Sequence, residues 1–305
     1  MPITSMDGLI DAANNGRHII INKASISAVA GRTISLASAT GTPTGIWSET
    51  TTGKAGVFPF ANNYSPTQIG SITVPENASP AGGYGNIVNA KGVCSVTGIV
   101  SIYHILWGWQ SQGTNLASTS WSPLINTAVQ GTSGAILMST FWSSPVVGRR
   151  GGQNTELWLE TLATGGTPVP TTCTVSYTNS GTTANRLALL SAATGNAPIA
   201  SSPVGTIQKF VLSTAGGSQD LGVESVQSIA NTGTWTAGTF RLQIVRVVAE
   251  IPCVANVPFS YNAIELGMPS LYTSFGGPGY LGIAFTSSTT TTGTIVMSLN
   301  MAQDG

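Results

Sequence analysis

Glu156 and Glu160 are the carboxylate pair in this sequence whose spacing could support chemistry. On a strand, residues four apart face the same side, with Trp158 between them, and two carboxylates flanking an aromatic ring suggest a glycosidase. The simpler interpretation is a half-buried strand with two solvated glutamates, because Leu157 and Leu159 form the opposite face. Sugar binding without catalysis is the third interpretation. Further tryptophans that could stack on sugar rings are Trp107, Trp109, Trp121 and Trp142.

Other catalytic groups are sparse. Of the two histidines, His18 and His104, the second lies in the most apolar stretch and is expected to be a hydrogen-bonded core residue. A Gly-x-Ser-x-Gly elbow is absent from the sequence and no cysteine has a histidine near it, so a nucleophilic triad is not expected. We therefore expect a protein that is not an enzyme.

The cysteines and carboxylates do not form a metal-binding pattern. The three cysteines are odd in number and widely spaced, which predicts buried reduced thiols and neither a disulfide framework nor a zinc site. They are Cys94, Cys173 and Cys253. The carboxylates are scattered and match neither an EF-hand nor a His-Glu-x-x-His pattern. We expect no metal ion.

One segment, Gly277–Gly282, formally matches a dinucleotide-binding glycine pattern. That motif needs a helix after it, so that the helix N-terminus meets the phosphates, whereas Ile283–Thr286 has the composition of a strand. We predict a β-turn here and no cofactor. Arg149 and Arg150 are the one adjacent basic pair, too few to hold nucleic acid, although they could contact an acidic neighbour.

Charge is unusually rare. The chain has 305 residues with 11 basic and 11 acidic side chains, so 7% of it is charged, where about 25% is ordinary. This balance excludes a basic nucleic-acid grip and an acidic tail. A surface with little charge tends to associate, which indicates a protein covered by partners in an assembly. The alternative is a neutral, hydroxyl-rich surface on a soluble protein, and composition does not decide between them.

Signals for export or membrane insertion are not found. The first residues lack a basic region followed by an apolar one, so no signal peptide is expected. The most apolar stretch, Ile99–Trp109, falls short of the ~20 residues that cross a bilayer. We expect no membrane partner.

The sequence predicts one short helix followed by strands. Ser5 can cap a helix over Met6–Asn14, with Gly16 after its last turn. Period-2 alternation predicts antiparallel strands at Thr172–Tyr177 and Thr294–Met301. Strands apolar on both faces are predicted at Val93–Trp107 and Phe240–Ile251, and further strands at His18–Asn22, Gln68–Val74, Ala135–Trp142, Glu156–Leu162, Ile207–Ser213, Val223–Ile229 and Gly279–Phe285. The expected fold is all-β, an antiparallel sandwich or jelly roll with one short N-terminal helix.

Domain boundaries are weakly marked. Residues 1–90 would hold the helix, a β segment and an extended loop, and residues 91–305 the main sandwich, unless the chain is a single domain. The stretch Thr50–Ala90 is rich in Gly, Pro and Asn. It is either a linker or a long loop lying on a neighbouring subunit. The sequence likewise leaves open whether the helix packs on its own domain or on a neighbour.

Several segments resemble a group of tailed-bacteriophage virion proteins that are encoded close to the major capsid protein. The similar segments are Met6–Ala12, Gly31–Leu36 with Gly41–Pro43, Val175–Asn179 before Gly181 and Arg186, Gly222–Ile229, Ile251–Pro252, Leu266–Leu271 and Gly279–Gly282. The resemblance implies a head structural protein of the cement or decoration type, a class that is commonly β-rich and often trimeric. The group has no catalytic motif, so no functional residue is carried over.

We therefore expect a virion protein, made in the bacterial host cytoplasm, that binds and stabilises the lattice of the major capsid protein as a homo-oligomer. A trimer is implied by the resemblance alone. The alternative is a tail-associated receptor-binding protein that recognises host carbohydrate. Aromatic residues in Gly/Pro-flanked segments are candidate interface anchors, with core filling as the simpler role for each: Trp47, Phe58, Phe60, Tyr64, Tyr272 and Phe275.

Overall fold

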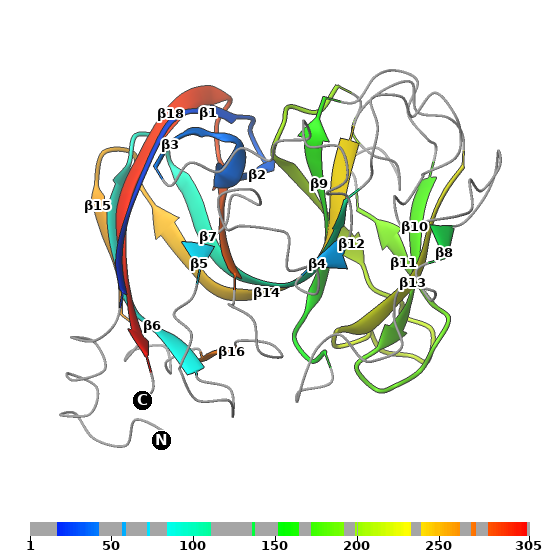
Figure 1. The fold of residues 1–305 in the computed structure, drawn as a ribbon. Coiled ribbons are helices and arrows are strands. Elements are labelled where there is room, and N and C mark those ends of the chain that lie inside the picture. The colour runs from blue at the N-terminus through cyan, green and yellow to red at the C-terminus, as the bar shows by residue number, and fades with distance from the viewer. Residues whose placement is uncertain are drawn as a thin grey trace. The chain divides into compact units, whose positions relative to one another are not determined.

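The protein is nearly all β, with antiparallel pairing, as the sequence predicts (Figure 1). The computed structural model describes residues 17–42, 57–58, 72–73, 84–110, 136–137, 152–164, 172–191, 199, 201–232, 239–262, 270–272 and 280–303. Within these ranges the helical structure is one 3-10 turn, η1 (Leu36–Ser38). The helix expected over residues 5–14 lies outside them.

The chain forms two compact units. Unit 1 comprises residues 1–47, 65–105 and 247–305, and unit 2 comprises residues 48–64 and 106–246. Most of unit 2 is therefore a segment inserted between two parts of unit 1. Two long strands, β7 (Gly98–Gln110) and β14 (Thr239–Cys253), contribute residues to both units. Residue 90, where the sequence suggested a boundary, lies inside strand β6 (Tyr84–Cys94).

The first sheet of unit 1 has the strand order β15-β6-β18-β1-β3, and β16 also pairs with β6. The bounds are β1 (Arg17–Ala28), β3 (Thr40–Thr42), β15 (Pro258–Asn262), β16 (Ser270–Tyr272) and β18 (Thr291–Gln303). Alternation along β18 buries Ile295, Met297 and Leu299, while Val296 faces outward and lies opposite Val93 of β6. The register of this sheet thus decides which side chains reach the core.

The second set of strands in unit 1 has the order β2-β17-β7-β14, with β5 paired to β17. The bounds are β2 (Thr33–Ser35), β5 (Ile72–Thr73) and β17 (Tyr280–Ser287). Tyr103 of β7 lies opposite Gly282 of β17, and a Cβ at position 282 would be 2.2 Å from the Tyr103 ring. The glycine is needed because the buried ring occupies that space.

The single strand expected over Val93–Trp107 is wrong at its start. β6 ends at Cys94, and β7 begins at Gly98 after a short bend. The run looked continuous because Val96 is also apolar and buried. The expectation of a strand buried on both faces is confirmed from Val100 to Ile105.

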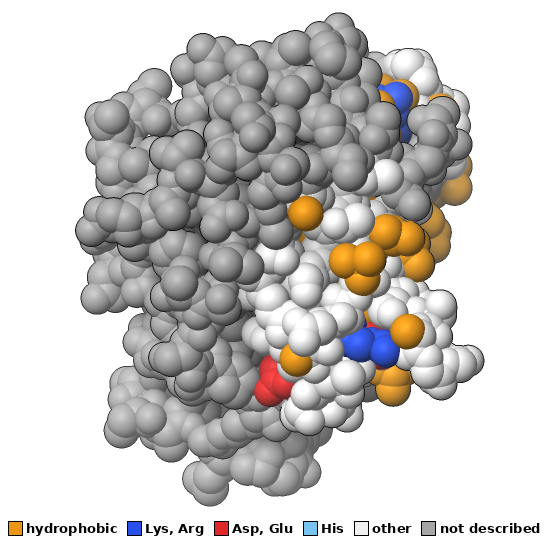
Figure 2. All heavy atoms as spheres, turned by 90° about the vertical axis from the view of Figure 1, so that its right-hand side faces the viewer, with side chains coloured by type: hydrophobic (Ala, Val, Ile, Leu, Met, Phe, Trp, Pro, Cys, Tyr) orange, Lys and Arg blue, Asp and Glu red, His pale blue; other side chains and the backbone are white. Residues whose placement is uncertain are grey.

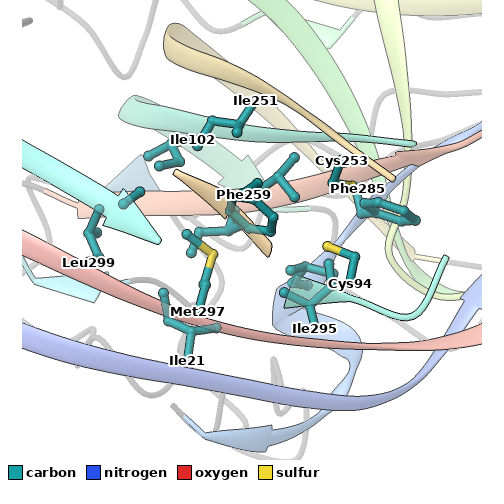
Figure 3. Packing of buried hydrophobic residues seen from close by; sticks show 14 of the residues in the cluster. Ile21, Cys94, Ile102, Ile251, Cys253, Phe259, Phe285, Ile295, Met297 and Leu299 are labelled. Carbon is teal, nitrogen blue, oxygen red and sulfur yellow. The ribbon is translucent and has the colours of Figure 1, made fainter. Parts of the chain in front are cut away.

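The main hydrophobic core belongs to unit 1 and draws side chains from both sets of strands (Figure 3). Its members are almost all aliphatic, aromatic or thiol side chains on the inward face of their strands. Those labelled in Figure 3 are Ile21, Cys94, Ile102, Ile251, Cys253, Phe259, Phe285, Ile295, Met297 and Leu299.

Unit 2 has the strand order β14-β9-β12-β11-β10-β13-β8. The bounds are β8 (Ile136–Leu137), β9 (Glu156–Ala163), β10 (Thr172–Asn179), β11 (Arg186–Leu190), β12 (Thr206–Val211) and β13 (Val223–Thr232). Strand β4 (Val57–Phe58) pairs with β7 at Trp109 and Gly108. The alternation predicted for β10 is confirmed, because Cys173, Val175 and Tyr177 are buried and the residues between them are half-buried.

Candidate functional site

Glu160 is buried in an ion pair, contrary to the expectation of a solvated glutamate. It lies opposite Arg241 of β14, and both side chains are 2% exposed. Arg241 donates to Glu160 Oε2 from Nε at 3.1 Å and also from Nη2. Gln243 Nε2 donates to the same oxygen at 2.6 Å. The expectation failed because the partner, Arg241, is 81 residues away in the chain.

Glu156, at the start of the same strand, is in a different environment. It forms an ion pair with Lys209 of β12 at 3.0 Å, with the two side chains 40% and 43% exposed. Trp158 Nε1 donates a hydrogen bond to Glu156 Oε2 at 2.7 Å, and the Lys209 ammonium lies 5.2 Å from the Trp158 ring centre. Trp158 is 1% exposed, so its ring has no free face on which a sugar could stack.

These contacts show that both carboxylates pair with side chains of neighbouring strands. A glycosidase needs one carboxyl group that gives up a proton and one that attacks or activates water, both open to the substrate. Glu160 is enclosed by Arg241 and Gln243, and Glu156 already accepts from Trp158 and pairs with Lys209. The geometry is that of strand-to-strand pairing across β12, β9 and β14.

A second polar cluster joins β10 and β11 to the loop before β13. Asp220 accepts from Tyr177 Oη at 2.6 Å, from Asn179 Nδ2 at 2.9 Å and from Arg186 through Nε at 2.8 Å and Nη2 at 2.9 Å. Burial by itself would raise the pKa of Asp220, but the hydrogen bonds from Arg186, Tyr177 and Asn179 outweigh it and lower that pKa to about 2. Burial and the bond to Asp220 raise the pKa of Tyr177. Asp220 stands alone in a loop, so no motif in the sequence marks it as a site residue.

The remaining candidate residues are dispersed. His104 is buried in β7 and His18 is exposed on β1. Phe58 is in β4 and Tyr272 is in β16, while the candidate anchors Trp47, Phe60, Tyr64 and Phe275 lie outside the described residues. Arg149, Arg150, Trp121 and Trp142 lie outside them too. In the described parts of the chain, no group of three His, Cys, Asp or Glu side chains is placed to hold a metal ion.

The described surface has apolar side chains on two sheet faces. In unit 1, Val93 and Val296 face each other across β6 and β18 at 36% and 43% exposure, with Ile20 of β1 at 58%. We call these three residues the valine face. In unit 2, Leu187, Leu189 and Val211 are exposed on β11 and β12, and Leu189 lies opposite Val211. We call these the leucine face.

Charges beside the leucine face are neutralised within the protein. Lys209 stands two residues before Val211 on the same side of β12 and is paired with Glu156. Arg186, the residue before Leu187, points to the opposite face of β11 and is paired with Asp220. Figure 2, viewed from the side on which β10, β11 and β13 appear in Figure 1, shows hydrophobic side chains among mostly uncharged ones. This arrangement is suited to burial against a partner.

Comparison with known proteins identifies no relative: no family model, curated protein or solved structure matches the chain. Among the described residues, no helix is long and apolar enough to span a bilayer.

Proposed function

We propose that this protein is a structural component of a bacteriophage head that binds and stabilises the lattice of the major capsid protein, without enzymatic activity. The leucine face carries the proposal. It is an apolar patch on a regular sheet whose neighbouring charges are already paired, so a partner can cover it without stranding a buried charge.

Burial of the leucine face would contribute favourably to association. Leu187, Leu189 and Val211 are 50%, 37% and 48% exposed, and covering a half-exposed aliphatic side chain is worth about 1 kcal/mol. Such a gain is small for one contact. A lattice repeats it at every copy, and a homo-oligomer that engages several subunits at once gains further through its effective concentration. Because the protein would bind the assembled shell better than free subunits, it would shift the equilibrium toward assembly.

The strand order of unit 1 supports a finer description of the fold, a jelly roll. Eight of its strands, taken as first to eighth along the chain, are β1, β2, β6, β7, β14, β15, β17 and β18. One sheet has the order sixth-third-eighth-first and the other second-seventh-fourth-fifth. This is the order of two interleaved Greek keys. Jelly rolls occur in viral capsid proteins but also in lectins and cupins, so the fold alone does not select the function.

The test is the amount of this protein in purified particles. We expect tens to hundreds of copies per particle, in fixed ratio to the shell protein, as counted by quantitative mass spectrometry. The variant carrying Leu187→Ser and Leu189→Ser should lose at least about tenfold in occupancy, since each lost contact is repeated in the lattice. Leu221→Ser is the matched control, because Leu221 is 72% exposed but lies in a loop outside the leucine face.

Two results would contradict the proposal. A handful of copies per particle would assign the protein to the tail, and saturable binding on a glycan array would favour the carbohydrate-binding alternative. Sedimentation of the purified protein tests the homo-oligomer separately, with a trimer as the expected species.

A further inference from the structure

Cys94 and Cys253 form a pair of thiols inside the core of unit 1. Cys94 is the last residue of β6 and Cys253 the last residue of β14, and they are 0% and 4% exposed. Cys253 lies close enough to the Cys94 thiol to help burial raise the pKa of Cys94. The Cys253 thiol donates in turn to the carbonyl of Gly98 at 3.4 Å. Figure 3 shows both side chains in the same part of the core, near Phe285.

Backbone hydrogen bonds hold the two cysteines together. Asn256 N, in the turn after β14, donates to the Cys94 carbonyl at 2.7 Å, and Ala255 N donates to Thr97 Oγ1 at 3.0 Å. A disulfide requires Cα atoms about 4.4–6.8 Å apart. The Cys253 thiol also reaches the carbonyl of Val96, two residues after Cys94, at 3.8 Å. Together with the hydrogen bonds between the two turns, this favours a separation in that range without movement of the strands.

We propose that Cys94 and Cys253 are a modification site, a dithiol that a peroxide oxidises to an intramolecular disulfide. The bond would close a loop from residue 94 to residue 253, which contains all of the segment 106–246 inserted into unit 1. A cross-link that closes a long loop restricts the unfolded chain more than a short one does. The inference stands on unit 1 alone and does not depend on the proposed function.

The reaction balances with hydrogen peroxide as the oxidant. Cys253 is the more exposed of the two residues and reacts first: its thiolate attacks one peroxide oxygen, the O–O bond breaks, and hydroxide leaves and takes up a proton to become water. Cys94 sulfur then attacks the sulfur of the resulting sulfenic acid. The S–O bond breaks, the disulfide forms, and a second water leaves with the Cys94 proton. Two thiols are oxidised and one peroxide is reduced to two waters.

Burial makes this oxidation slow in the folded protein. Burial and the contact with Cys253 raise the pKa of Cys94, so this thiol keeps its proton. Since the thiolate is the nucleophile, the pair reacts when local opening admits the oxidant. The dithiol is therefore expected to persist in a reducing cytoplasm and to close after transfer to an oxidising medium.

The test uses the full-length protein purified under reducing conditions and then exposed to hydrogen peroxide. Intact mass should show the loss of two hydrogen atoms, and proteolysis without reductant should yield a peptide linking Cys94 to Cys253. The oxidised protein should melt at a higher temperature than the reduced one, and a dithiol reductant should reverse both changes. Cys173→Ser is the matched control, because Cys173 is also buried but lies on β10 of unit 2, and it should behave like the wild type.

Stepwise oxygen addition to the wild-type cysteines without a linked peptide would overturn the proposal, as would a linkage through Cys173. The wild-type peptide analysis decides the matter even if Cys94→Ser or Cys253→Ser fails to fold. Where these variants fold, they should form no intramolecular disulfide and show no rise in melting temperature after oxidation.

Discussion

Replacing Glu160 with glutamine tests whether the buried ion pair stabilises unit 2. The substitution keeps the size of the side chain and removes the carboxylate charge that is paired with Arg241, whose side chain is 2% exposed. Glu156→Gln is the matched control on the same strand, since it makes the same chemical change at a side chain that is 40% exposed. Any difference in the free energy of unfolding between the two variants therefore arises from the burial of the Glu160 ion pair.

The two substitutions are expected to lower the free energy of unfolding by very different amounts. Removing one partner of a buried pair destabilises a protein by about 3–5 kcal/mol, because the other charge stays buried and uncompensated. Removing one partner of an exposed pair costs about 1 kcal/mol or less. With a urea dependence of about 1–3 kcal/mol per molar, Glu160→Gln should lower the unfolding midpoint of unit 2 by about 1 M or more, whereas Glu156→Gln should change it little.

Urea unfolding followed by tryptophan fluorescence provides the measurement, because Trp158 lies between the two glutamates and is buried. If Glu160→Gln is too unstable to study, the double variant Glu160→Leu with Arg241→Met serves instead. Removing both charges should restore stability to near the wild-type value or above it. Equal midpoints for Glu160→Gln and Glu156→Gln would refute the reasoning, and so would a double variant as unstable as Glu160→Gln.

Two further predictions concern the Asp220 cluster and its neighbourhood. Hydrogen bonds lower the pKa of Asp220 from 3.8 to about 2 in the folded protein, so its stabilisation is complete above pH 3.8 and is lost as the pH falls through 2. After discounting for solvent screening the loss is about 1 kcal/mol, and urea midpoints of Asp220→Asn should lack this acid dependence. A Cβ at Gly222 would lie 1.9 Å from the Gly152 carbonyl oxygen. Gly222→Ala should therefore cost about 1–3 kcal/mol in urea unfolding, whereas Gly181→Ala, whose Cβ would meet its nearest atom at 3.4 Å, should be close to neutral; equal costs would contradict the clash.

Local periodicity predicted much of the β structure. Strands β9, β10, β13, β14, β17 and β18 fall where alternation or an apolar run placed them, because each side chain's burial depends on the face it occupies. The short strand β11 was missed. Its leucines face both inward and outward, Leu190 buried and Leu189 exposed, so no alternation of polarity marks it.

The pairing of residues across the fold could not be predicted. Glu160 was expected to be solvated, because the register that places it opposite Arg241 is set by tertiary structure. The boundaries of unit 2 could not be predicted from the sequence for a related reason. Residues on either side of the inserted segment 106–246 pack together in unit 1, and one-dimensional composition carries no record of contacts over that separation.

The placement of the few charged side chains explains how their scarcity could favour association. Three ion pairs occupy six charged side chains within the described chain, and Lys23 is turned inward, where burial lowers its pKa and its ammonium donates to the Ala39 carbonyl. Charged side chains that are paired or buried in this way do not repel neighbouring molecules. A sheet face such as that of Leu187 and Leu189 then offers a partner apolar area with little desolvation cost from ions. A partner that fits it needs apolar and hydroxyl groups at the contact, because Lys209, the charged side chain described on the same side of β12, is already paired with Glu156.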